Sequence, residues 1–173
     1  MNVSRLLAIL GFIIIGVASR LLPHPPNFTS INAIALFGIL YLENWKLSLA
    51  TVLLTMFLSD IILGFHSTMP FIYLSFSLII LIGYRFKKKI SLQRIPVVYL
   101  VTSLFFFVVT NFGVWMTNSL YPKTINGLGF CYLAAIPFFM NQILGDLTYA
   151  TLLFGYIYFV KNFLLKIGQL VKT

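Results

Sequence analysis

The chain carries few side chains that can do chemistry, and most of them lie within apolar stretches. Its 173 residues include only three acids and two histidines. Asp60 and Asp146 lie inside apolar segments, as do the amides Asn111 and Asn141. Polar and ionisable groups are costly inside a membrane and usually serve a function there. The chemistry that these residue types predict is the binding of a polar ligand by hydrogen bonds and charge.

Patterns of catalysis are missing from the sequence. A phosphate-binding loop ends in Gly-Lys-Ser/Thr, and no Gly-Lys pair occurs. There is no His-Glu-x-x-His helix, no nucleophile elbow and no evident pair of base and nucleophile. His24, His66 and Asp60 could hold a metal ion, but nothing in their spacing demands it. We therefore expect no enzyme, no catalytic residue, no cofactor and no metal site.

The elements that position the polar residues must be membrane helices. The chain is 60% hydrophobic and 9% charged, whereas a globular domain is about 25% charged. This composition excludes a soluble domain and a disordered chain. A single cysteine, Cys131, excludes a disulfide scaffold. The net charge of +9 comes from short basic runs between apolar segments, which argues against nucleic-acid binding.

The apolar segments predict an all-α integral membrane protein, a single bundle of about six transmembrane helices. A spanning helix needs about 20 apolar residues, and a membrane barrel would instead alternate apolar and polar residues. The expected helices cover residues 5–22, 30–42, 47–65, 70–86, 95–116 and 140–160. Pro137 is expected to divide the last apolar region, so that residues 130–139 form a short outer segment.

The basic residues predict the orientation of these helices. If the N-terminus is cytoplasmic and six helices alternate, only Arg20 and Lys123 of the 12 Lys and Arg residues lie outside. Because Lys and Arg concentrate in cytoplasmic loops, we expect both termini in the cytoplasm. The basic residues 85–94 are expected to contact anionic membrane lipid, with a dedicated partner site as the alternative.

With this orientation, the polar groups gather in the outer third of the bundle. Asp60 lies about 7.5 Å from the outer end of its helix, at 1.5 Å per residue. The arrangement predicts a pocket for a small solute that opens to the outside and has apolar packing beneath it. The expected binding residues are Arg20, Asn32, Asp60, His66, Asn111, Trp115, Asn141 and Asp146.

Structural roles remain open for several of these residues. Asp60 or Asp146 could form a buried ion pair with Arg20, and the amides could link helices through hydrogen bonds. We expect Asp146 to be the more structural acid, because Asn141 and Gln142 offer it partners on its own helix. In a binding role, Arg20 would suit an anionic group and the nearby aromatic residues a flat or ring-bearing solute.

The sequence resembles an uncharacterised family of small bacterial membrane proteins with six helices. Its first half carries the resemblance in SRLLPHPPNFT (residues 19–29), AIALF (33–37), SD (59–60), LGFH (63–66) and YLSF (73–76). Its second half carries it in TNFGVW (110–115), YPKT (121–124), CY (131–132), AIPFF (135–139) and GD (145–146). The resemblance covers nearly the whole chain and implies a multi-pass protein of the bacterial inner membrane, without an assigned function.

The chain is also similar, in size, helix count and a proline loop before an Ala-rich helix, to the substrate-binding (S) subunits of energy-coupling-factor transporters. That resemblance implies capture of a small molecule at the outer face, together with a membrane coupling subunit and two ATPases. Those subunits often dock through Ala-x-x-x-Ala on the first helix, a spacing that Ala8, Gly11, Gly16 and Ala18 lack. Asn2 stands where the nickel and cobalt members carry histidine, which argues against that branch.

The rival interpretation is a structural membrane protein that binds protein partners. A cell-shape factor of the wall-synthesis complex is similar in size and helix number. A solute-binding subunit needs the outer cluster of polar residues, whereas a scaffold does not, so the cluster favours solute binding.

Overall fold

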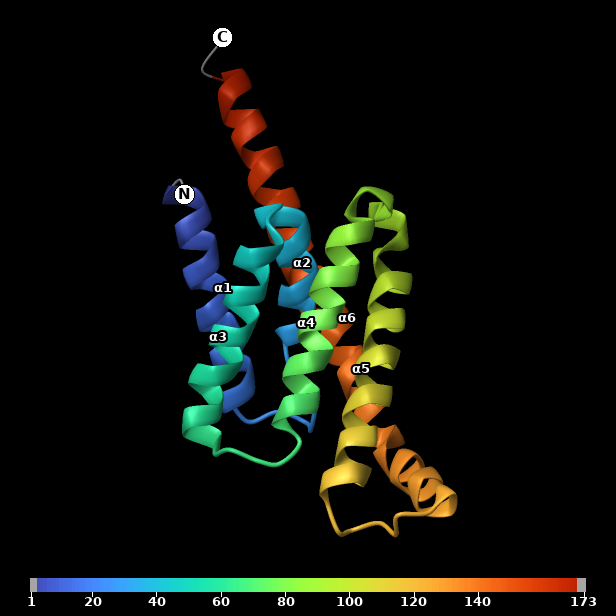
Figure 1. Cartoon of the computed structure of the whole chain (residues 1–173). Coiled ribbons are helices and arrows are strands. Elements are labelled where there is room, and N and C mark those ends of the chain that lie inside the picture. The colour runs from blue at the N-terminus through green and yellow to red at the C-terminus, as the bar shows by residue number, and fades with distance from the viewer. Residues whose placement is uncertain (1–2, 171–173) are drawn as a thin grey trace.

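The chain folds into a bundle of helices (Figure 1). The computed structural model describes residues 3–170, and within them the side chains of all but residues 92, 157, 158 and 160–170. Two short 3-10 turns, η1 (Lys87–Lys89) and η2 (Leu92–Arg94), join the fourth helix to the fifth. The α-helices of this part of the chain are α1 (Val3–Leu21), α2 (Ile31–Leu42), α3 (Trp45–Leu63), α4 (Met69–Phe86), α5 (Ile95–Thr117) and α6 (Ile125–Leu170).

Most of the helices are long and apolar enough to cross a membrane. Within the described residues, five of them meet that condition: α1, α3, α4, α5 and α6. Large apolar side chains such as Leu7, Ile14, Ile62 and Leu144 are exposed on their outer faces. A lipid environment accepts such a surface, whereas water does not. The predicted all-helical class is confirmed, and the exposed faces are compatible with a multi-pass membrane protein.

The remaining helix, α2, is short and lies at the centre of the bundle. Its 12 residues extend about 18 Å at 1.5 Å per residue, well short of the roughly 30 Å hydrocarbon core. It contacts each of the other five α-helices, and every residue from Ile31 to Ile39 is buried. The six predicted helices are therefore present, but α2 is a covered core helix, too short to span the hydrocarbon core.

The segments that connect the helices lie at two opposite ends of the bundle (Figure 1). The start of α1, residues 43–44, the η1–η2 turn and the far end of α6 lie at one end, which we call the terminal end. Residues 22–30, 64–68 and 118–124 lie at the other, which we call the loop end. The polar residues near the loop end therefore come from segments that are far apart in the sequence.

The bounds of α1 to α5 lie within two residues of those expected from the sequence, but the last region differs. Residues 130–139 and 140–160 belong to one helix of 46 residues, α6, with Pro137 inside it. The prediction of a break at Pro137 is wrong. A proline removes only one backbone donor, and membrane helices tolerate that loss where neighbouring helices hold them. Here Tyr132 donates to the Val108 carbonyl of α5 at 2.7 Å and Gln142 to the Ser103 carbonyl at 3.3 Å, on either side of the proline.

Candidate functional site: a cavity at the loop end

The α1–α2 loop, residues 22–30, folds over the loop end of the bundle. The end of the loop is tied back to α1, where the Oγ atoms of Ser19 and Ser30 lie 2.8 Å apart. Asn27 has a φ of 65°, a left-handed conformation in which asparagine is enriched among residues other than glycine. A Cβ atom at Gly145 of α6 would lie 3.1 Å from the Phe28 Cα atom. The missing side chain at Gly145 therefore lets the loop approach α6 closely.

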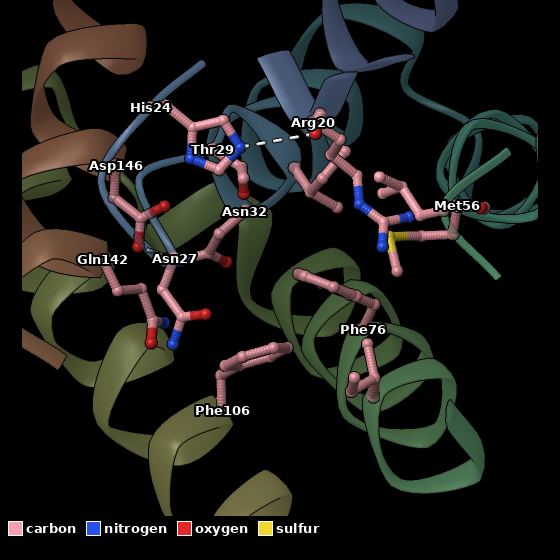
Figure 2. Close-up of a pocket in the computed structure, with 13 residues that line it drawn as sticks. Arg20, His24, Asn27, Thr29, Asn32, Met56, Phe76, Phe106, Gln142 and Asp146 are labelled. Carbon is pink, nitrogen blue, oxygen red and sulfur yellow. Dashed lines mark hydrogen bonds between the residues drawn. The ribbon is translucent and has the colours of Figure 1, made fainter. Parts of the chain in front are cut away.

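Beneath this loop lies a cavity of about 210 Å³ (Figure 2). All six α-helices and the loop contribute to its lining. The lining residues are Arg20, His24, Asn27, Thr29, Ile31, Asn32, Met56, Leu63, Ile72, Phe76, Phe106, Gln142 and Asp146. We call it the loop-end cavity, and its size suits a small solute.

One wall of the loop-end cavity is polar and centres on Asn32 of α2. The Asn32 Nδ2 atom donates to Asp146 Oδ2 at 2.8 Å and to Thr102 Oγ1 at 3.1 Å. Ser103 Oγ lies 2.5 Å from the same Asp146 oxygen. Asn32 and Asp146 are only 3% and 2% exposed. These hydrogen bonds link α2, α5 and α6 along the polar wall of the cavity.

The side-chain oxygen of Asn32 takes no part in this hydrogen-bond network. Within the residues that the structure describes, Asn32 Oδ1 is buried and has no hydrogen-bond partner. A buried acceptor left without a donor costs about 1–3 kcal/mol. Because Asn32 lines the cavity, a molecule inside it is placed to supply the missing donor.

Arg20, on the far side of the cavity, is held by an ion pair. Its Nη2 atom lies 2.6 Å from Asp60 Oδ1, and its Nη1 atom donates to the Met56 carbonyl at 3.1 Å and to Ser59 Oγ at 2.5 Å. Tyr73 donates to the other Asp60 oxygen at 2.7 Å. Asp60 is 1% exposed and does not belong to the lining. The buried ion pair with Arg20 therefore involves Asp60 and not Asp146.

Aromatic and loop residues form the rest of the cavity lining. The rings of Phe76 and Phe106 have centroids 4.8 Å apart and are tilted by 39°. His24, at the rim, places its Nδ1 atom 2.7 Å from the Pro25 carbonyl and its Nε2 atom 3.4 Å from the Arg20 carbonyl. Figure 2 shows Asn32, Gln142 and Asp146 on one side of the cavity, with Phe76 on the other.

The structure brings together some of the predicted site residues and separates others. Arg20, Asn32 and Asp146 line the loop-end cavity, and Asp60 lies behind Arg20. The others form local contacts outside the lining. His66 is exposed and forms a hydrogen bond with Thr68. Asn111 donates to the Phe107 carbonyl of its own helix, and Trp115 donates to the Pro122 carbonyl. Asn141 is next to Gln142 in the sequence but does not line the cavity. Among the described residues, no three His, Cys, Asp or Glu side chains gather as a metal site.

Sequence reasoning gave no cavity role to several lining residues. Gln142 was expected to act as a partner of Asp146 or to link helices, and His24 was considered only as a possible metal ligand. A usable signal existed for Gln142, because it precedes Asp146 by four residues and so shares its helix face. Phe76 and Phe106 carried no such signal, since they lie in segments that are apolar on every side.

A second hollow, of about 280 Å³, lies between α4 and α5 beside α2. Its described lining is apolar except for Thr102 and includes Leu36, Ile79, Val97 and Phe105. Such a surface offers almost no hydrogen bonds with which to select a polar molecule. The smaller loop-end cavity is therefore the candidate site.

Comparison with protein families matches residues 1–167 to a family described as a family of unknown function, DUF6580. The match confirms the resemblance to an uncharacterised family that the sequence predicted. Comparison with the curated proteins and with the solved structures gives no match.

Proposed function

Since the chain belongs to DUF6580, a family of unknown function, we propose its role from the site itself: it captures a small polar solute in the loop-end cavity. The observation that carries this proposal is the unpaired Asn32 Oδ1 atom in the cavity wall. Small-molecule sites combine apolar and aromatic walls with a few placed polar groups. The Phe76–Phe106 pair and the Asn32–Asp146 pair supply those two kinds of wall.

The distribution of basic residues supports an outward-facing site. Lys46 and the basic residues 85–94 lie at the terminal end, whereas Arg20 and Lys123 lie near the loop end. By the positive-inside rule, the terminal end then faces the cytoplasm and the cavity opens to the outside of the bacterial inner membrane. Both termini are cytoplasmic in this arrangement.

Capture without transport is the activity proposed for the chain alone. The sequence offers no nucleotide-binding loop, so any ATP-driven uphill movement would depend on other chains. A membrane coupling subunit and ATPases, as in the energy-coupling-factor transporters that the sequence resembles, are the proposed partners. The purified chain should therefore bind solute but show no ATPase activity and no sustained uphill uptake in liposomes.

The test is to identify small molecules that co-purify with the gently solubilised protein by mass spectrometry. Ile72→Trp places a large ring against the cavity, because Ile72 is part of its lining. Leu74→Trp, on the same helix, is the matched control, because Leu74 is 50% exposed on the outer surface. We expect the wild type and Leu74→Trp to carry the same solute and Ile72→Trp to have lost it.

Two results would contradict the proposal. If the Ile72→Trp variant retains the solute, the molecule binds elsewhere. If the wild type carries no small molecule and none in a cell extract raises its melting temperature, the rival scaffold function is favoured.

A further inference from the structure

The polar wall of the loop-end cavity presents acceptors. Asn32 Nδ2 is already used twice, towards Asp146 Oδ2 at 2.8 Å and Thr102 Oγ1 at 3.1 Å. The pairing of this nitrogen with a carboxyl oxygen assigns the orientation of the amide and leaves Oδ1 as its free atom. That atom is buried and unpaired within the described residues. The free group of Asn32 therefore requires a donor from whatever occupies the cavity.

Asp146 adds to the acceptor character of the same wall. It is 2% exposed and lines the cavity next to Asn32. Its carboxyl group faces Asn32 and Ser103. An anionic group of a solute would have to sit beside these oxygens, which repel it.

The positive groups of the lining already face a carboxylate or carbonyl oxygens. The guanidinium group of Arg20 is shared among Asp60, Ser59 and the Met56 carbonyl. The ring nitrogens of His24 face the carbonyls of Pro25 and Arg20. Of the described lining residues, these are the two that can carry positive charge. Because Asp60 already balances the charge of Arg20, we expect a weaker attraction for an anionic solute than the sequence alone suggested.

The aromatic part of the lining favours a flat ring. Phe76 and Phe106 present two rings with centroids 4.8 Å apart. Aromatic rings attract other rings in offset or edge-to-face arrangements. Together with a cavity of about 210 Å³, these rings favour a small ring-bearing molecule.

From these observations we infer that the solute is a small ring-bearing compound, uncharged or cationic, whose N–H or O–H groups donate to Asn32 Oδ1 and to the Asp146 carboxyl group. This inference rests on the proposed function, since it specifies the ligand class of the same cavity. The inference excludes anionic solutes and solutes without hydrogen-bond donors, both of which the proposed function alone would allow.

Four probes that share a single benzene ring differ in charge and in N–H donors. Benzamidine is a cationic ring compound with N–H groups, and benzamide is an uncharged one. N,N-dimethylbenzamide lacks the N–H groups, and benzoate is an anion. The measurement is the shift in melting temperature of the purified full-length chain in detergent, titrated with each probe at millimolar concentrations.

We expect benzamidine and benzamide to stabilise the wild type, with apparent dissociation constants at least about tenfold lower than those of the other two probes, which is about 1.4 kcal/mol. Asn32→Leu should remove the preference. Thr102→Val should keep it, because Thr102 contacts Asn32 Nδ2 and is not part of this cavity's lining. If Asn32→Leu does not fold, the comparison of the four probes on the wild type still decides the inference.

The outcomes separate the inference from the proposed function. If benzoate or N,N-dimethylbenzamide binds as well as benzamide, and the Ile72→Trp variant abolishes that binding, the cavity is a site but the donor inference is overturned. If none of the four probes stabilises the wild type, the inference is also overturned, while the proposed function still depends on the co-purification result.

Discussion

At the scale of single residues, Arg20 and Asp60 make a contact whose loss should be costly. Asp60 is 1% exposed, and its partner Arg20 is 13% exposed. We expect Asp60→Asn to lower the free energy of unfolding by about 3–5 kcal/mol, because it leaves the Arg20 charge buried without its partner. Denaturant titration of the protein in mild detergent measures this loss.

Glu43→Gln is the matched control for that substitution, because Glu43 is an exposed acid in the turn between α2 and α3. Its stability should equal that of the wild type. Equal stability of the Asp60→Asn and Glu43→Gln variants would show that the ion pair contributes nothing to the fold.

Asp146 should respond differently from Asp60. An amide oxygen in Asp146→Asn can still accept from Asn32 and Ser103, the two partners of the carboxyl oxygen. We therefore expect a smaller loss of stability than for Asp60→Asn and about a tenfold weaker affinity for benzamidine, about 1.4 kcal/mol. Denaturant and probe titrations check the two effects separately. An unfolded Asp146→Asn variant would instead support the sequence-based expectation that Asp146 is the more structural acid.

The buried polar residues could be found from the sequence, but their partners could not. Asp60, Asn111 and Asp146 stood out because each interrupts an apolar segment. Which way each one points depends on which face of its helix meets protein, and these helices are apolar towards lipid and towards protein alike. For this reason the sequence left Arg20 with two possible partners and did not reveal that Asn111 turns to its own helix at the Phe107 carbonyl.

At the scale of the elements, the close approach of α1 to the bundle depends on Gly16. A Cβ atom there would clash with the Thr55 methyl group and lie 3.2 Å and 3.3 Å from the terminal methyl groups of Ile34 and Ile31. We expect Gly16→Ala to lower the free energy of unfolding by about 1–3 kcal/mol through overpacking. Thermal unfolding in detergent, with the wild type in parallel, measures the change.

Gly11 provides the control on the same helix. A Cβ atom at Gly11 would meet nothing within 4 Å, so Gly11→Ala should leave stability unchanged or raise it by up to about 1 kcal/mol through helix propensity. If the two alanine variants are equally stable, α1 is not held against α2 and α3 through Gly16.

The elements themselves were more predictable than their environment. In the structure, Asn44 accepts from the backbone at the start of α3, and Pro70 lies in the first turn of α4. The central position of α2 was not predicted, since its residues are as apolar as those of a lipid-facing helix. Its length of 12 residues was the available signal that it does not span.

At the scale of the whole molecule, the orientation in the membrane has a direct test. Reporter fusions after Lys89, in the η1–η2 turn, should report the cytoplasm. Insertions after Leu120, which is 73% exposed in the loop between α5 and α6, should report the outside. The expected result follows from the excess of basic residues at the terminal end. An outside signal after Lys89 would reverse the orientation and turn the loop-end cavity towards the cytoplasm.

The hydrogen bond between Asn32 and Asp146 can form only late in the synthesis of the chain. The two residues are 114 positions apart in the sequence. At about 5–20 residues per second, the ribosome reaches Asp146 about 6–23 s after Asn32. Throughout that interval, α2 lacks its carboxyl partner and one of the helices that will cover it. It is also too short to span the bilayer by itself. We therefore expect the core around α2 to stay incomplete for seconds during synthesis, until α6 has been made.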